Sequence, residues 1–155
     1  MANEPKKSTG SGTKASISTD GQTFKKFASI TKLGPPNMSR GTVDVTDLNS
    51  FEDNNQMKEF LPDFIEADEM SIEGYHKAGD EGREAAEGAF YNATIVTIKI
   101  DLPAAIGKTM TVEGYVTSYR PIGDIGSDAG LAFSMSIKPV KKPAMSDTAA
   151  ASATE

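Results

Sequence analysis

The sequence has no cysteine and no tryptophan, and its only histidine is His76. The absence of cysteine excludes disulfide bonds, thiolate nucleophiles and thiolate metal sites. A catalytic pair that uses histidine would have to use His76, and no nucleophile-elbow motif accompanies it. We therefore interpret His76, which lies between Tyr75 and Lys77, as a surface residue, and we expect no serine–histidine catalysis.

Long apolar runs are absent as well. Nowhere do 18 apolar residues follow one another, so we expect no membrane-spanning helix and no membrane partner. Lys6 and Lys7 near the N-terminus are followed by serine, threonine and glycine rather than by an apolar stretch, which argues against a secretory signal.

Acidic residues outnumber basic ones, 22 to 16, which gives a formal net charge of −6. A protein that holds nucleic acid through phosphates usually presents a basic face, so this balance argues against tight DNA binding. The excess is concentrated between Glu52 and Glu73, where Lys58 is the only base. The EF-hand spacing is absent from this acidic region, and we expect neither a metal ion nor any other cofactor.

Alternation of apolar and polar residues predicts most of the fold. A strict period of two, as in Val96, Ile98 and Ile100, is typical of strands with one buried face, and such strands favour antiparallel sheets. The pattern recurs near residues 43–46, 70–73, 96–102, 110–117 and 131–138, with a weaker strand at 24–33. The sequence thus predicts a mainly β fold, an antiparallel β-sandwich or partly open barrel.

One segment has helical rather than strand periodicity. Residues 80–91 place Ala85, Ala86, Ala89 and Phe90 on one stripe, and Asp80 is suited to cap the helix N-terminus. The two glycines within it, Gly82 and Gly88, each weaken an isolated helix by up to about 1 kcal/mol. We therefore expect one α-helix that packs on the flank of the sheet.

The chain divides into one folded domain and two polar ends. Residues 1–22 and 144–155 are predicted to be flexible arms, and residues 23–143 to be the β-sandwich domain. Within the domain, residues 47–68 lack a clean period and form a long predicted loop. This loop is rich in large apolar side chains that need a surface to cover them, either the chain's own sandwich or another copy of the protein. They are Leu48, Phe51, Met57, Phe60, Leu61, Phe64 and Ile65.

Several motifs, taken in order and spacing, resemble one known family. After Gly34-Pro35-Pro36 they are SRGTVDVTDLNS at 39–50, KEFLPDF at 58–64, EMSIEG at 69–74, GKTMTVEGYVTSY at 107–119 and FSMSIKP at 133–139. Together they resemble the tail tube, or major tail, proteins of long non-contractile-tailed bacteriophages of the lambda type. The resemblance covers about residues 24–143. One departure is Asp63, where many relatives have glycine.

The resemblance implies a structural virion protein without enzymatic activity. Members of this family associate with copies of themselves as hexameric rings, and the rings stack into a tube through which DNA passes without specific binding. It further implies assembly in the bacterial host cytoplasm, a final place in the virion tail, and other tail components at the tube ends.

Two sets of residues become candidate sites under this interpretation. Six of the apolar loop residues, Leu48, Phe51, Met57, Phe60, Leu61 and Phe64, are expected to contact neighbouring subunits. Asp101 and Glu113, on polar strand faces, are candidates for acids that face the lumen and repel phosphates.

Two other classes of function remain open from the sequence. One is a β-sandwich module that binds carbohydrate or another ligand, although such modules often display tryptophan, and here only four tyrosines could serve. The other is a small hydrolase with two carboxylates, because sequence does not give the separation that such a pair requires.

Overall fold

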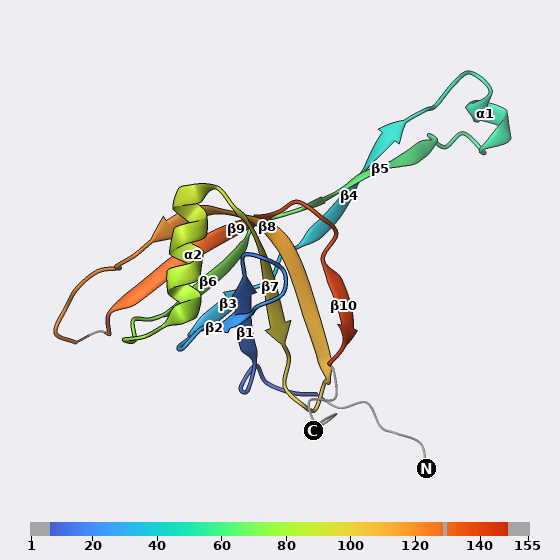
Figure 1. The fold of residues 1–155 in the computed structure, drawn as a ribbon. Helices are drawn as coiled ribbons and strands as arrows, with labels where there is room; N and C mark the ends of the chain where they lie inside the picture. Colours follow the sequence, from blue (N-terminus) through green and yellow to red (C-terminus); the bar gives the residue numbers. More distant parts are fainter. Residues whose placement is uncertain (1–6, 129, 149–155) are drawn as a thin grey trace, which may run out of the picture.

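The computed structural model describes residues 7–128 and 130–148. Within them the chain forms a mainly antiparallel β architecture with two helices (Figure 1). The elements are β1 (Lys14–Ser18), β2 (Lys25–Lys26), β3 (Lys32–Gly34), β4 (Met38–Asp44), α1 (Ser50–Asp53), β5 (Phe60–Ala67), β6 (Met70–Tyr75), α2 (Glu81–Asn92), β7 (Ile95–Asp101), β8 (Lys108–Arg120), β9 (Ala132–Pro139) and β10 (Ala144–Asp147).

Eight strands form the body and two form a separate hairpin. The body sheet has the order β2-β1-β7-β8-β9-β6-β3, with β10 paired to β8, and all of its pairings are antiparallel. Strands β4 and β5 pair only with each other. The described residues form an open β-sandwich with a flanking helix and no closed barrel, which confirms the predicted fold class.

The long strand β8 joins the parts of the body sheet. One of its edges pairs with β7, while the other pairs with β10 along residues 108–111 and with β9 along residues 114–120. Gly114 lies where β8 and β9 approach closely, because a Cβ there would lie 2.2 Å from the carbonyl oxygen of Lys138. A side chain at this position would force the two strands apart.

The core follows the predicted alternation. Val96, Ile98 and Ile100 of β7 are fully or almost fully buried, whereas Thr97, Lys99 and Asp101 between and after them are half-buried and Ile95 is exposed. The other side chains with at most 2% exposure that complete this apolar cluster are Ile17, Met70, Ile72, Ala86, Val112, Phe133, Met135 and Ile137. The apolar stripe of each predicted strand thus reaches one common core.

Helix α2 covers this core, as its sequence predicts. The Asp80 carboxylate caps it by accepting from Arg83 N at 3.1 Å, and the same oxygen accepts from Ala28 N. Ala86 and Ala89 are buried against the sheet. Gly82 is required by packing, because a Cβ there would lie 2.8 Å from the carbonyl oxygen of Lys26.

The structure corrects the predicted N-terminal arm. Residues 14–18, placed in the flexible arm 1–22, instead form β1, which lies between β2 and β7 with Ala15 and Ile17 in the core. Ser16 and Ser18 are also buried, so this strand is covered on both faces although polar and apolar residues alternate along it. Residues 1–6 lie outside the described residues.

The C-terminal boundary and the long loop also differ from the prediction. Residues 144–147 of the predicted C-terminal arm form β10, and residues 149–155 lie outside the described residues. Residues 60–67 of the predicted loop 47–68 form β5. None of the helices in residues 7–128 and 130–148 is both long and apolar enough to cross a bilayer.

Candidate functional site: the projecting hairpin

Residues 38–67, here called the hairpin, extend away from the body (Figure 1). Strands β4 and β5 pair from Met38 opposite Ala67 to Asp44 opposite Phe60, with a register shift between Arg40 and Thr42. Every residue of β4 is exposed, as is all of β5 except Ala67. A two-stranded hairpin without a packed face is marginally stable at best in water. In the described residues, the body thus leaves most of this hairpin uncovered.

The tip of the hairpin is an ordered turn around Asp47. The Asp47 carboxylate accepts from Asn49 N at 2.9 Å and from Ser50 N at 3.1 Å, and Ser50 is buried. After α1, Asn55 and Gln56 both have positive φ angles, which reverses the chain toward β5. The tip thus has a defined shape of its own.

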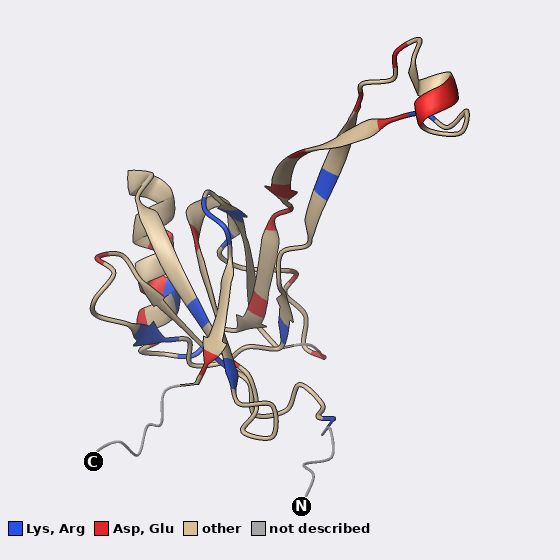
Figure 2. Ribbon diagram, turned by 90° about the vertical axis from the view of Figure 1, so that its right-hand side faces the viewer, with Lys and Arg blue, Asp and Glu red and all other residues tan. Residues whose placement is uncertain are grey.

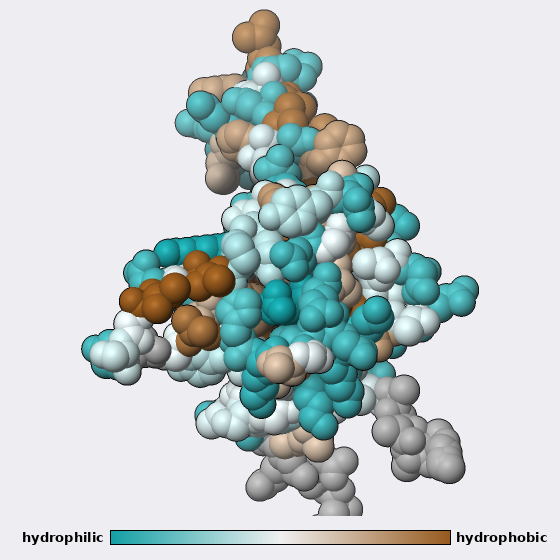
Figure 3. Space-filling model, turned by 60° about the vertical axis from the view of Figure 1, so that its left-hand side comes forward, coloured by the Kyte–Doolittle hydropathy of each residue, from teal (hydrophilic) through white to brown (hydrophobic). Residues whose placement is uncertain are grey.

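Large apolar side chains cover much of the hairpin surface. The six residues predicted to contact other subunits are all exposed: Leu48 97%, Phe51 64%, Met57 68%, Phe60 52%, Leu61 56% and Phe64 87%. Figure 3 shows brown apolar side chains among those of the hairpin at the top of the view, above a mostly hydrophilic face of the body. Val43 and Ile65, which were not among the six predicted contact residues, add to this surface at 48% and 49% exposure.

The hairpin also carries most of the net negative charge. Its seven acids and two bases give −5, compared with −6 for the whole chain. Figure 2 shows the acidic residues in red along the hairpin and at α1. At the outer end of β4, hydrogen bonds from Thr46 lower the pKa of the Asp44 carboxyl, so this group stays ionised well into acid.

Polar contacts hold the base of the hairpin against the body. Lys138 Nζ donates to the carbonyl oxygen of Ala67 at 2.9 Å, and Asp68 N donates to the carbonyl oxygen of Asn37 at 2.8 Å. Thr117 Oγ1 donates to the Glu69 carboxylate. The contacts of Lys138 and Thr117 link β5 and the turn after it to β9 and β8, whereas the bond from Asp68 to Asn37 closes the base of the hairpin itself.

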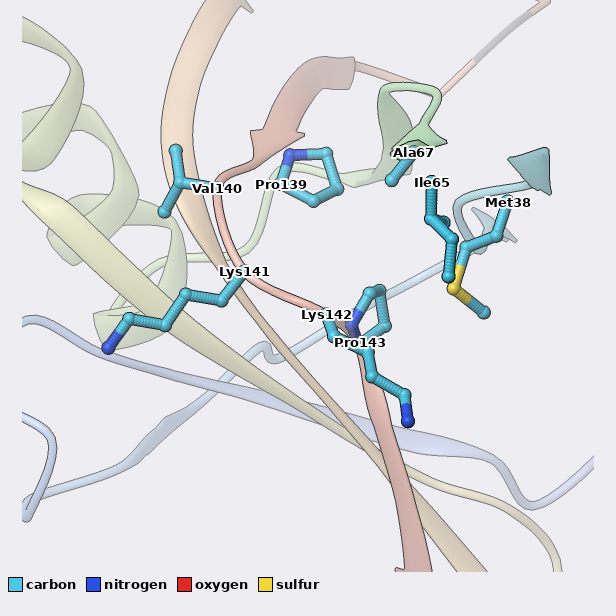
Figure 4. Close-up of a pocket in the computed structure, with 8 residues that line it drawn as sticks. All are labelled: Met38, Ile65, Ala67, Pro139, Val140, Lys141, Lys142 and Pro143. Atoms are coloured by element: carbon cyan, nitrogen blue, oxygen red, sulfur yellow. The ribbon is translucent and has the colours of Figure 1, made fainter. Parts of the chain in front are cut away.

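A small groove lies where the hairpin meets the body. It has a volume of about 210 Å³ and is lined by Met38, Ile65, Ala67 and residues 139–143. Figure 4 shows Met38 and Ile65 on one side of this groove, with Pro139 and Pro143 across from them. The Lys141 side chain extends away from the groove, and its Nζ lies 3.6 Å from the Glu113 carboxylate. No sequence pattern indicated this groove, because it forms between segments far apart in the chain.

The two acids predicted to face the lumen lie on the same face of the sheet. Asp101 pairs with Thr109 across β7 and β8, and Glu113 pairs with Thr97 four residues further along β8. Both are half-buried and both have partners, since Asp101 accepts from Thr109 Oγ1 at 2.7 Å and Glu113 faces Lys141. The register thus brings the two acids onto one surface, but neither is an isolated charge.

The other candidate chemistry of the chain does not converge on a site. His76 is half-buried, where its ring meets Phe133 edge-on at 5.9 Å, and Nε2 contacts the carbonyl oxygen of Pro121. It is therefore less exposed than predicted, because it packs on a core residue. Among residues 7–128 and 130–148, no three acidic or histidine side chains are grouped as metal ligands.

Comparison with known proteins places the chain in a class of fold. No family model matches the sequence, and no curated protein matches it. Similar solved structures are chains of tail and tube assemblies, all under 20% identical to this one in the cases given below. At this identity the likeness shows the fold.

Three of these structures illustrate the likeness. A chain of the anti-feeding prophage baseplate superposes with a TM-score of 0.69 at 11% identity, over 96% of this chain and 99% of its own. A chain of the virion of a gene transfer agent gives 0.66 at 16% identity, over 90% and 99%. A chain of the SPP1 tail tube gives 0.61 at 17% identity, over 87% and 76%.

Proposed function

We propose that this chain is a structural subunit of a bacteriophage tail tube, of the long non-contractile type that its motifs resemble. Copies of the chain associate as stacked hexameric rings in the virion tail. The fold shared with chains of tail and tube assemblies supports this proposal. The six-fold symmetry of the gene transfer agent tail and of the anti-feeding prophage baseplate supports the ring number.

The observation that carries the proposal is the exposed apolar surface of the hairpin. Its six predicted contact residues are each at least half exposed in the single chain. Burial of one such side chain against a neighbour stabilises the contact by about 1.5–3 kcal/mol. If another copy covers the hairpin, its apolar residues become buried. This contact would explain why the chain carries them on a projection that the described part of its own body leaves exposed.

The body offers a second kind of contact. Strands β2 and β3 end the body sheet, and each has one edge unpaired among the described residues. An unpaired edge can accept a strand from a neighbouring copy, so edge-to-edge pairing is our proposal for closing the ring. A contact between two different surfaces, repeated around an axis, closes into a ring.

Passage of DNA without binding is the finer part of the proposal. The chain has a net charge of −6, and phosphates are repelled by a surface with excess carboxylates. Asp101 and Glu113 remain our candidates for the lumen-facing acids, with Thr109 and Lys141 as their partners. Assembled tubes are expected not to retain duplex DNA at low salt, whereas tight retention would contradict a repulsive wall.

The tube ends require other partners. Chains with this fold also occur in structures of the anti-feeding prophage baseplate and of its tube-terminating cap. These likenesses support a role in which the terminal rings contact further tail components. The role is structural, and no catalytic step is part of the proposal.

The direct test is the assembly state of the purified full-length chain. Sedimentation velocity over a wide range of concentrations, followed by negative-stain electron microscopy, is expected to show rings or tubes. A chain that stays a monomer at the highest attainable concentration would contradict the proposed function and favour a binding module.

A further inference from the structure

The groove at the base of the hairpin is apolar inside and has a cation at its edge. Met38 and Ile65 line it and remain 43% and 49% exposed, and Val140 is 46% exposed. Its volume of about 210 Å³ is below the roughly 300–1,000 Å³ that is usual for small-molecule sites. The groove therefore suits protein side chains better than a free ligand.

One wall of the groove, formed by residues 139–143, carries charge opposite to that of the hairpin tip. From Ala132 to Ser146 the chain has three lysines and no acid. Lys138 and Lys141 have partners, whereas Lys142 has no carboxylate within 4 Å among residues 7–128 and 130–148. At the tip, Glu52 and Asp53 are exposed and lie next to the exposed Phe51.

We propose that this groove receives the hairpin tip of a second copy of the chain, with Phe51 in the apolar part and Glu52 and Asp53 near Lys142. The inference rests on the proposed self-assembly and names the surface that takes part in it. It pairs an uncovered apolar tip with an uncovered apolar groove, and an acidic segment with a basic one.

The geometry excludes docking of the tip within one chain. Strand β5 has eight residues, so the two ends of the hairpin strands lie about 25 Å apart. The tip and the groove are at opposite ends of this hairpin (Figure 1). Each contact therefore joins two different surfaces on two copies, and in a ring or a tube such a contact repeats from one subunit to the next.

Chemical cross-linking tests the contact directly, because the chain has no cysteine of its own. One variant carries Leu48→Cys at the tip and Val140→Cys at the groove. A matched control carries Leu48→Cys and Lys77→Cys, with the second cysteine on the exposed loop between β6 and α2. A bis-maleimide with a spacer much shorter than the hairpin is added to assembled protein, and the products are separated by denaturing electrophoresis.

A ladder of covalent multimers from the groove variant, at least fivefold stronger than from the control, is the expected result. Assembled material that gives no ladder, or an equal ladder from the control, overturns the groove contact while leaving the proposed assembly in place. Protein that does not assemble at all overturns the proposed function and the groove contact together.

Charge reversal provides a second readout without cysteines. Lys142→Glu and Glu52→Lys are each expected to raise the protein concentration at half-assembly about tenfold, and the chain with both changes is expected to return to within threefold of the original. Lys77→Glu, which makes the same change in net charge on another surface, is expected to have less than a twofold effect. Lack of recovery in the doubly changed chain would refute the pairing.

Discussion

Substitution of Phe64 is expected to weaken assembly strongly while leaving the stability of the single chain almost unchanged. Phe64 lies on β5, is 87% exposed, and makes little use of its apolar surface within the single chain. Phe64→Ser should therefore change the free energy of unfolding by no more than about 0.5 kcal/mol. Under the proposed assembly, nearly the whole side chain is available for contact with a neighbouring copy.

The expected loss in assembly follows from that available surface. Burial of a phenylalanine contributes about 1.5–3 kcal/mol, and each 1.4 kcal/mol corresponds to a tenfold change in an equilibrium constant. Phe64→Ser should thus raise the concentration required for assembly roughly 10- to 100-fold. Pelleting of assembled protein at a series of concentrations measures this change, and thermal melting by circular dichroism measures the stability of the unassembled chain.

A matched variant tests whether the loss of assembly depends on the position of the residue in the hairpin. Ile125 is 76% exposed on the loop between β8 and β9, so Ile125→Ser removes a comparable apolar surface elsewhere. If Phe64→Ser assembles at the concentrations of the unchanged chain, or if Ile125→Ser weakens assembly equally, the reasoning about the hairpin is refuted. An unfolded Phe64→Ser chain would likewise contradict the exposure from which the prediction starts.

Two further predictions concern the body. Gly88→Ala should stabilise the chain by up to about 1 kcal/mol and raise its melting temperature by about 2–4 °C, because no atom lies within 4 Å of the added Cβ. Gly82→Ala should lower the melting temperature, because the Cβ added there would lie 2.8 Å from the carbonyl oxygen of Lys26. Hydrogen bonds from Gln22 N, Thr23 N and Ser18 Oγ lower the pKa of Asp20 from 3.8 to about 2. The stability this group provides is therefore present above pH 3.8 and lost as the pH falls toward 2, and an NMR titration of Asp20 with a midpoint near 4 would contradict it.

Marginal stability of the hairpin in isolation accounts for its composition. Both of its faces are open, so no side chain of the body stabilises the pairing of β4 with β5 along most of its length. The contacts of Lys138 with Ala67 and of Asp68 with Asn37 hold only the base. The proposed contact with another copy would support the outer part of the hairpin by covering Phe60 and Phe64.

Residues whose surroundings are local were predictable from the sequence. The predictions of a strand from Val96 to Ile100 and of a helix capped by Asp80 were correct. One face of each element is buried and the other faces solvent, so apolar and polar residues recur in the sequence with the period of that element. The six residues proposed as contacts were recognised in the sequence as apolar side chains that need a covering surface, and all six are exposed in the structure.

The sequence did not predict the strands that have both faces exposed or both faces buried, because burial in such a strand does not alternate from one residue to the next. Strand β5 is exposed on both faces, so Phe60 to Ala67 has no alternation that could distinguish a strand from a loop. Strand β1 is buried on both faces, and its two serines made Lys14 to Ser18 resemble a polar tail. The groove beside Met38 forms where β4, β5 and residues 139–143 meet in space. The pairing of strands that are distant in the sequence sets this arrangement, so no single segment of the sequence predicts it.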